Sequence, residues 1–476
     1  MANEKITLLS DEPLDPQSDL GRSIEAIGAI PDAQRVVGMV DLHFKVRTEN
    51  PSSVAVATKE RIIPKLSSVA QNCGMALVRT SARRDDFDDA RLGRFFDRLR
   101  SDDDRIMRRP DLSIEDMRRI VELGARAVLQ RYDLPESILE NFEYGGMIRE
   151  AETSPGSVLA HLVPTFTLAR GRYGFGVIPA GNHFLEMQSV SEVIDSALCE
   201  RYGLAEGVVT FMLHSDGGLV ADDIGNLYGN RTTTTGSTRA FYALRKLLFH
   251  LADARSLANW NEKWAYYFGA DRYLTISPET AEGKRYLAAK RLSMNAGYAC
   301  RLETIGRLRG IAESVLGPQA ADLRVLCDFS HNSILREDVG GSPLWVHRHN
   351  ACRVTPGRLV FLPGYSYTSS YVCVGGAGAP RFLHTMDHGA GKTIDRFREK
   401  GLVRLLNGSR VTRSFCNESS EPRIEPHYSN EGIDKVIEVL ARHDIVIPIA
   451  RLTPFAGYRY YWKGRLARLT QAVRSR

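Results

Sequence analysis

The feature that most constrains this chain is a set of five short segments in which histidine or cysteine stands beside small or polar residues. The segments are Cys73-Gly74, Gly181-Asn182-His183, His214–Gly218, His331-Asn332 and His388–Lys392. They fall on expected loops after strand-like stretches, whereas the expected helices carry almost none of them. Because they lie far apart in the sequence, only a tertiary fold can bring them together. The pattern therefore differs from a zinc finger, in which ligands follow one another at fixed spacing.

The segment His388-Gly389-Ala390-Gly391-Lys392 has the composition of a phosphate-binding loop with a nucleophile. Glycine lets a phosphate approach backbone N–H groups, lysine neutralises its charge, and an imidazole can attack phosphorus. Considered alone, the segment could also be a turn that happens to hold a histidine. Neither a Walker A pattern nor a dinucleotide fingerprint occurs in the sequence, which disfavours P-loop and Rossmann folds.

Cys73, His183, His214 and His331 are candidate ligands of a metal ion. Transition metals favour thiolate and imidazole ligands, and each of these residues lies beside Gly, Asn or Ser, where the backbone can fold tightly around an ion. For any one of the four considered singly, a structural role is the alternative.

The composition indicates the cellular compartment and the class of binding partner. The seven cysteines are scattered without a CxxC pair, which argues against a disulfide framework and favours a reducing cytoplasm. We see no signal peptide and no apolar run of membrane-spanning length, so we expect no membrane association. The net charge of 63 − 57 = +6 permits nucleic-acid binding. The basic and aromatic stretch 458–476 suits a phosphate backbone or a nucleobase, with a solvated terminal helix as the alternative.

Periodicity predicts an α+β chain with one main domain at 36–464, a polar and loosely attached lead-in at 1–35 and a basic tail at 465–476. A capping box at Ser113–Asp116 marks a helical elaboration at about 80–150. The other expected elements are strands in 36–78, glycine-rich strands in 156–235, helices at about 238–258 and 279–316, strands in 323–376, a helix after 430 and a strand at 445–450.

Taken in order, the segments resemble motifs of the RtcB family, the GTP- and manganese-dependent RNA ligases of tRNA splicing and RNA repair. The family's Gly-Asn-His-Phe-Leu-Glu is matched in full by Gly181–Glu186, and its Asn-Cys-Gly by Asn72-Cys73-Gly74. The family's His-Gly-Ala-Gly is His388–Gly391. The remaining matches include Asp41-Leu42-His43, His331-Asn332, Pro363-Gly364 and Lys463-Gly464, so the resemblance runs from about residue 36 to 464.

The resemblance implies a single large α+β body, with mixed β-sheets around a central metal and nucleotide cleft and with peripheral helices. It implies that the protein joins RNA 3′-phosphate or 2′,3′-cyclic phosphate ends to 5′-hydroxyl ends. In such a reaction His388 would attack the α-phosphorus of GTP and become guanylylated, and GMP would then pass to the RNA 3′-phosphate. RNA is the implied partner, and an activating protein is a further one.

The resemblance also assigns roles to individual residues. One or two Mn²⁺ ions would bind Cys73, His183, His214 and His331. The nucleotide would contact Asn182, Glu186, Ser370, Gly389, Gly391, Tyr428 and Lys463. RNA or phosphate would contact Arg348, Arg353 and Lys392.

Several positions depart from the family pattern. Ala70 stands where the family has an aspartate three residues before the motif cysteine, His349 replaces a lysine, Tyr365 a serine and Lys392 an arginine. The arginine of the family's His-Ser/Thr-Gly-Ser-Arg is absent from His214–Gly218. These departures keep two alternatives open: a non-ligating protein that binds metal and RNA or nucleotide, and a nucleotidyl transfer with altered nucleotide choice.

Overall fold

Helices and strands alternate along the whole of the described chain. The structure is a computed structural model that describes residues 4–10, 13–46, 48–67, 71–149, 159–229, 237–269, 271–406, 408 and 410–461. Within these residues the strands form three sheets, and two of them contain both parallel and antiparallel pairs. The predicted α+β class with mixed sheets is therefore confirmed.

The largest sheet has nine strands. Its order is β11-β12-β16-β5-β6-β4-β7, with β14 pairing β16 and β15 pairing β14. The strands are β4 (Gly74–Arg83), β5 (Phe184–Val193), β6 (Val208–Ser215), β7 (Arg324–Ser330), β11 (Leu359–Leu362), β12 (Ser370–Gly375), β14 (Val411–Cys416), β15 (Arg423–Pro426) and β16 (Val446–Arg459).

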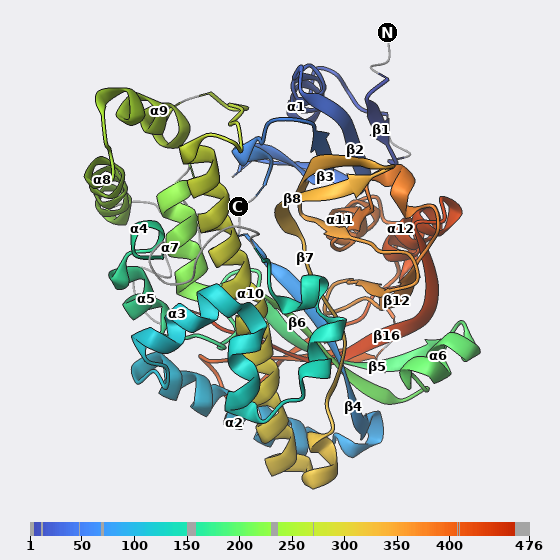
Figure 1. The fold of residues 1–476 in the computed structure, drawn as a ribbon. Coiled ribbons are helices and arrows are strands. Elements are labelled where there is room, and N and C mark those ends of the chain that lie inside the picture. The colour runs from blue at the N-terminus through green and yellow to red at the C-terminus, as the bar shows by residue number, and fades with distance from the viewer. Residues whose placement is uncertain are drawn as a thin grey trace.

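A five-stranded sheet of order β1-β2-β3-β9-β8 lies above the large one, and a two-stranded sheet joins β10 to β13 (Figure 1). The strands of these two sheets are β1 (Ile6–Leu8), β2 (Ala33–Lys45), β3 (Asn50–Thr58), β8 (Asn332–Val339), β9 (Ser342–His349), β10 (Ala351–Arg353) and β13 (Thr385–Asp387).

The described α-helices surround these sheets. They are α1 (Asp19–Gly28), α2 (Asp89–Arg108), α3 (Ile114–Leu123), α4 (Leu159–Leu162), α5 (Thr165–Gly171), α6 (Ser196–Tyr202), α7 (Gly218–Tyr228), α8 (Ser237–Ala252), α9 (Leu257–Phe268), α10 (Ala281–Leu316), α11 (Gly391–Glu399) and α12 (Glu431–Arg442). The 3₁₀ turns are η1 (Pro64–Leu66), η2 (Arg84–Asp86), η3 (Gly124–Tyr132), η4 (Glu136–Asn141), η5 (Glu143–Gly146), η6 (Pro318–Ala321) and η7 (Ala379–Phe382). Among the described helices, none is both long and apolar enough to cross a bilayer.

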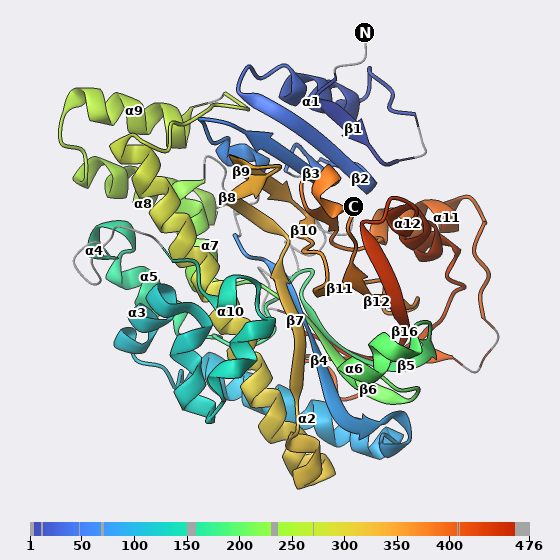
Figure 2. The ribbon, with the colours of Figure 1, turned by 45° about the vertical axis from the view of Figure 1, so that its right-hand side comes forward.

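The long helix α10 organises one side of the molecule. Thr280 caps its N-terminus by accepting a hydrogen bond from the backbone N–H of Gly283, and Gly317, with φ of 95°, follows its last residue. Figures 1 and 2 show α10 crossing beside the large sheet with α2, α3 and α7 packed around it, while α11 and α12 lie on the other side. Burial around most of its circumference explains why polar residues such as Arg301 lie in the interior.

The large sheet separates two hydrophobic cores. Along β4, Ala76 and Val78 pack into the core that contains α10, whereas Met75 and Leu77 pack into the core that contains α12. This alternation follows from the two-residue period of a strand, and burial on both faces fits the nearly continuous apolar run. The sheet is therefore held rigidly from both sides, and its ends provide fixed points for loops.

The structure corrects three predicted elements. The segment 1–35 is not a loosely attached lead-in, because β1 pairs with β2 and α1 buries Ile24 and Ile27 against the five-stranded sheet. Residues 156–235 were expected to be strand-like, but their described part contains α4, α5, α6 and α7 around β5 and β6. The helix expected at 238–258 is shorter and ends as α8, because Ser256 caps the separate helix α9.

Other expectations are confirmed. Residues 80–150 are rich in helix, and the Ser113 hydroxyl and Asp116 carboxylate form the reciprocal bonds of a capping box at the start of α3. The expected helix at 279–316 is α10, and the helix after Asn430 is α12. The predicted tail at 465–476 lies outside the described residues.

Candidate active site

The four predicted metal ligands lie at one end of the large sheet. Cys73 and His183 immediately precede β4 and β5, His214 lies near the end of β6, and His331 follows β7. β6 runs antiparallel to β4 and β5, and β7 runs antiparallel to β4. The first residues of β4 and β5 therefore lie beside the last residues of β6 and β7. The register places Gly74 opposite both Ser215 and Ser330. Ligands that are distant in sequence thus become neighbours through sheet pairing.

The ligand atoms converge closely. The Sγ atom of Cys73 lies 3.3 Å from Nε2 of His183 and 3.2 Å from Nε2 of His214. The Nε2 atoms of His214 and His331 are 3.0 Å apart. Bond lengths of about 2.0–2.3 Å to a shared ion would separate neighbouring ligand atoms by about 3–3.7 Å, so the spacing fits ligation. Cys73, His183 and His214 form a compact, buried group that could hold a metal ion.

Hydrogen bonds to the outer ring nitrogens orient these imidazoles. Nδ1 of His183 lies 3.3 Å from the Ala180 carbonyl, and Nδ1 of His214 lies 3.1 Å from the Asn182 carbonyl. A carbonyl only accepts, so each Nδ1 carries the hydrogen and each Nε2 turns a lone pair toward the cluster. Burial holds the pKa of His214 well below its usual value, which keeps the ring neutral and able to ligate. The donor set therefore fits a divalent transition-metal ion.

Local backbone geometry accounts for the sequence Asn72-Cys73-Gly74. Asn72 has a φ of 54°, a conformation that asparagine tolerates better than most residues. At Gly74 a Cβ atom would lie 2.6 Å from the Phe329 carbonyl oxygen and 2.7 Å from Nη1 of Arg301, so only glycine fits. Both flanking residues thus hold the Cys73 thiol at the cluster.

Arg301 supports the ligands from inside the protein. Its fully buried guanidinium donates to both carboxylate oxygens of Asp328, at 2.6 and 2.7 Å. It also donates to the backbone carbonyls of Asn72 and Ser215, at 3.1 and 3.2 Å. These two residues are the neighbours of Cys73 and His214, so one side chain fixes the backbone beside two ligands.

The predicted nucleophile His388 lies next to this cluster. Its ring centroid is 4.8 Å from that of His331. Burial, with the positive charge of Lys45 as a further cause, holds the pKa of His388 well below its usual value. The ring is therefore neutral near pH 7 and keeps a lone pair for attack on phosphorus.

The loop after His388 is tied to the start of α11. The buried carboxylate of Asp41 accepts hydrogen bonds from the backbone N–H and hydroxyl of Thr393, at 2.6 and 2.7 Å. Gly391 faces Tyr365, because a Cβ atom there would lie 3.0 Å from the phenol oxygen and 3.2 Å from Cζ. The phenol donates to Asp395 at 3.0 Å. Tyr365 thus occupies the space beside the predicted phosphate loop.

Two of the predicted nucleotide contacts belong to one hydrogen-bonded chain. The Gln188 amide donates to Glu186 at 2.6 Å and to the Ser370 hydroxyl at 2.9 Å, and Ser370 in turn accepts from the backbone N–H of Gly364 at 3.0 Å. Burial raises the pKa of Glu186 to about 7, against the opposing effect of the Gln188 hydrogen bond. Tyr428 approaches the same loop through its ring contact with Tyr367, at 5.5 Å between centroids.

Comparison with known proteins agrees with this geometry. The family model described as tRNA-splicing ligase RtcB matches residues 23–459. The chain belongs to the RtcB family. It is 26% identical over 421 residues to the tRNA-splicing ligase RtcB of Pyrococcus abyssi, an alignment that covers 81% of this chain and 42% of that protein.

Other members are similar at the same level. The RNA-splicing ligase RtcB of Mycobacterium bovis is 28% identical over 378 residues, which cover 73% of this chain and 77% of that protein. The tRNA-splicing ligase RtcB of Thermococcus kodakarensis is 24% identical over 347 residues, with coverage of 67% and 65%. The chain thus spans less than half of the length of the P. abyssi relative and about two thirds of the T. kodakarensis one.

The three residues predicted to contact RNA or phosphate differ from one another in exposure. Arg348 is only 1% exposed, and its guanidinium donates to Glu337 at 2.9 Å and to Thr385 at 3.1 Å. We therefore assign Arg348 a structural role in place of the predicted phosphate contact. Arg353 keeps 28% of its side chain exposed while pairing with Glu337 at 3.3 Å, and Lys392 is partly exposed. Lys463 and Ala70 lie outside the described residues.

Sequence reasoning missed two charged groups near the cluster. Lys45, near the end of β2, is close enough to influence the pKa of both Cys73 and His388. Asp216 follows β6 and brings a carboxylate oxygen to 3.7 Å from Nε2 of His183. In the sequence, only the position of Asp216 two residues after His214 indicated that it lies near the cluster. No sequence feature indicated this for Lys45.

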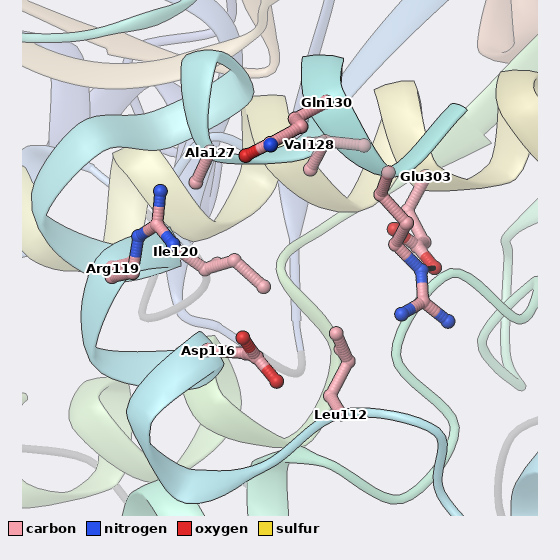
Figure 3. A pocket seen from close by; sticks show the side chains of 9 residues that line it. Leu112, Asp116, Arg119, Ile120, Ala127, Val128, Gln130 and Glu303 are labelled. Atoms are coloured by element: carbon pink, nitrogen blue, oxygen red, sulfur yellow. Dashed lines mark hydrogen bonds and ion pairs between the residues drawn. The ribbon is translucent and has the colours of Figure 1, made fainter. Parts of the chain in front are cut away.

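A separate hollow of about 270 Å³ lies in the helical elaboration (Figure 3). Asp116 and Arg119 reach toward it from α3, Val128 and Gln130 from η3, and Glu303 from α10. Its lining contains none of the predicted ligands or nucleotide contacts. It is therefore distinct from the candidate active site.

Proposed function

We propose that the protein is an RNA ligase that joins RNA 3′-phosphate or 2′,3′-cyclic phosphate ends to 5′-hydroxyl ends, with GTP and Mn²⁺, in tRNA splicing or RNA repair. The observation that carries the proposal is the 4.8 Å separation of the His388 and His331 rings, which places a neutral imidazole beside a Cys/His cluster. Membership of the RtcB family supports the same activity.

In the proposed reaction a ring nitrogen of His388 attacks the α-phosphorus of GTP. A nitrogen–phosphorus bond forms, the bond to the β-phosphate oxygen breaks, and pyrophosphate leaves with the electron pair. The nitrogen–phosphorus bond then breaks as an oxygen of the RNA 3′-phosphate takes the GMP group; a 2′,3′-cyclic end gives this phosphate once water has opened its ring. The incoming 5′-hydroxyl attacks the 3′-phosphate, and GMP leaves.

The chain's own residues have distinct parts in this scheme. Cys73, His183, His214 and His331 would hold the divalent ion, which would offset negative charge on phosphate oxygens. The backbone of Gly389 and Gly391 would approach the phosphates, with Lys392 adding positive charge. Around the nucleoside we propose the contacts expected from the family motifs, namely Asn182, Glu186, Ser370, Tyr428 and Lys463.

A second candidate is nucleotidyl transfer with altered nucleotide choice. Tyr365 favours it, because its phenol fills space directly beside Gly391, where the family has the smaller serine. A non-ligating protein that binds metal and RNA is the remaining alternative. It would retain the cluster without forming a covalent intermediate.

One experiment separates these functions. The purified chain is incubated with Mn²⁺ and each α-labelled nucleoside triphosphate in turn, and an acid-labile, base-stable protein adduct is measured. We expect an adduct with GTP that is lost in His388→Ala and kept in His161→Ala, which changes an exposed histidine. An adduct with another nucleotide supports the second candidate, whereas metal binding without any adduct overturns the enzyme proposal. Adduct formation by the chain alone would show that the proposed activating protein is dispensable.

A further inference from the structure

Asp216 lies in the short connection between β6 and α7, two residues after the ligand His214. It is 9% exposed, so its carboxylate is largely removed from water. One oxygen, Oδ1, accepts a hydrogen bond of 2.8 Å from the backbone N–H of Gly218 at the start of α7. This bond fixes the carboxylate as part of a tight turn and leaves Oδ2 directed elsewhere.

Oδ2 of Asp216 lies 3.7 Å from Nε2 of His183. Because Nδ1 of His183 faces the Ala180 carbonyl and carries the hydrogen, Nε2 of a neutral ring has only a lone pair to offer. Two electron-rich atoms then face each other in a buried place. Such an arrangement is unfavourable unless a cation or an added proton lies between them.

The surrounding donors favour a cation over a proton. Nε2 of His183 also lies 3.3 Å from Sγ of Cys73, which in turn lies 3.2 Å from Nε2 of His214. Cys73, deprotonated when it binds an ion, and the carboxylate of Asp216 would together supply two negative charges, which match the charge of a divalent ion. The separation of 3.7 Å between Oδ2 and Nε2 is also one that two ligands of the same ion can have.

We propose that Asp216 is a metal ligand, binding the divalent ion on the His183 side of the cluster through Oδ2. The inference rests on the metal dependence of the proposed function and adds an oxygen donor to a set of sulfur and nitrogen donors. Carboxylate oxygen suits Mn²⁺, whereas thiolate and imidazole alone suit Zn²⁺ well. Asp216 therefore gives the site its capacity for Mn²⁺.

The test is metal binding by the full-length chain, measured for Mn²⁺ and for Zn²⁺ by calorimetry and, for Mn²⁺, by electron paramagnetic resonance. Asp216→Asn keeps an oxygen for the Gly218 bond but removes the negative charge. We expect a Mn²⁺ affinity that is lower by about tenfold or more, with a smaller loss for Zn²⁺. The matched control is Asp222→Asn on the following helix, which should leave both affinities unchanged.

Thermal unfolding in the presence of a chelator shows whether each variant folds. If Asp216→Asn does not fold, the test uses Asp216→Ser, which also retains a side-chain oxygen for the turn. Unchanged Mn²⁺ affinity in a folded variant overturns the proposal. The adduct assay is independent of this result, because a chain can bind Mn²⁺ through Asp216 and still form no adduct.

Discussion

The imidazole of His388 lies 4.8 Å from the imidazole of His331, although the two residues follow strands of different sheets. His331 follows β7 of the large sheet, and His388 follows β13 of the two-stranded sheet. The backbone N–H of Ala351, the first residue of β10, donates to the His331 carbonyl at 3.0 Å and joins the two sheets beside the site. The proposed nucleophile and the proposed metal ligand are therefore held as one unit.

Replacing Arg301 should weaken both the fold and metal binding. In Arg301→Met the buried carboxylate of Asp328 loses its partner, so we expect the free energy of unfolding to fall by about 3–5 kcal/mol. The Asn72 carbonyl loses a donor as well, which should lower metal affinity. Urea denaturation with chelator measures the first effect and calorimetry the second. Arg442→Met, at an exposed pair with Glu438, should cost less than about 1 kcal/mol; an equal cost at both sites would contradict the argument.

Gly391→Ala should impair guanylylation while sparing the metal cluster. The added methyl group would meet the phenol of Tyr365 at 3.0–3.2 Å, and either the loop or the ring must move. We expect a clear fall in adduct formation with unchanged Mn²⁺ binding. Tyr365→Ser in the same chain should restore part of the loss. Gly310→Ala, which adds a methyl group in open space on α10, is the control. No rescue by Tyr365→Ser would show that the phenol is not the obstacle.

The Glu186 carboxyl should make stability depend on pH. Its pKa is about 7 in the folded protein and about 4.5 in the unfolded chain, so the folded state binds the proton more tightly. The resulting stabilisation is complete below pH 4.5 and is lost as the pH rises to 7, at up to about 1.4 kcal/mol per pH unit. Between pH 4.5 and 7 the free energy of unfolding of the wild type should therefore fall relative to that of Glu186→Gln.

The control for this pH profile is Glu438→Gln, which changes an exposed carboxylate. Its profile should run parallel to that of the wild type. Burial also raises the pKa of Asp41 to about 6 and that of Asp387 to about 7, so the Glu186→Gln variant should keep part of the slope. A constant difference between Glu186→Gln and wild type from pH 5 to 8 would refute the assignment.

The two predicted arginine contacts should behave differently. Arg353 is partly exposed, so Arg353→Ala should weaken RNA binding for every sequence and reduce the salt dependence by about one phosphate contact. Arg348 is buried against Glu337, so Arg348→Ala should chiefly lower the melting temperature. Fluorescence anisotropy with single-stranded RNA at several salt concentrations separates the effects. If both variants are folded and lose RNA affinity equally, Arg348 contacts RNA and its purely structural role is wrong.

The four candidate ligands could be named from the sequence because each lies beside Gly, Asn or Ser and because the order of these segments resembles the RtcB family. The structure explains the flanking residues of Cys73, because Asn72 has a positive φ and Gly74 has no room for a Cβ atom. The strands from β7 to β12 likewise follow from apolar runs in 323–376.

The remaining features depend on tertiary contacts. Lys45 looks like any lysine at the end of a strand, and only the packing of the five-stranded sheet brings its charge near His388. Arg348 has the sequence context of a basic surface cluster, but its partner Glu337 lies on the neighbouring strand β8 and draws it inside. The segment containing α1 reads as polar, and only its packing on the five-stranded sheet shows that Ile24 and Ile27, three residues apart on one helix face, are buried.

The convergence of two strand starts and two strand ends has a consequence for folding kinetics. Cys73 and His331 meet only when β4 and β7 have paired across some 250 intervening residues, and such non-local contacts form slowly. All four proposed ligands come together only when β4, β5, β6 and β7 have paired, so an ion has no complete site before this part of the large sheet has formed. Metal uptake should therefore report the last stage of folding, and it should shift the equilibrium toward the native state without hastening its formation.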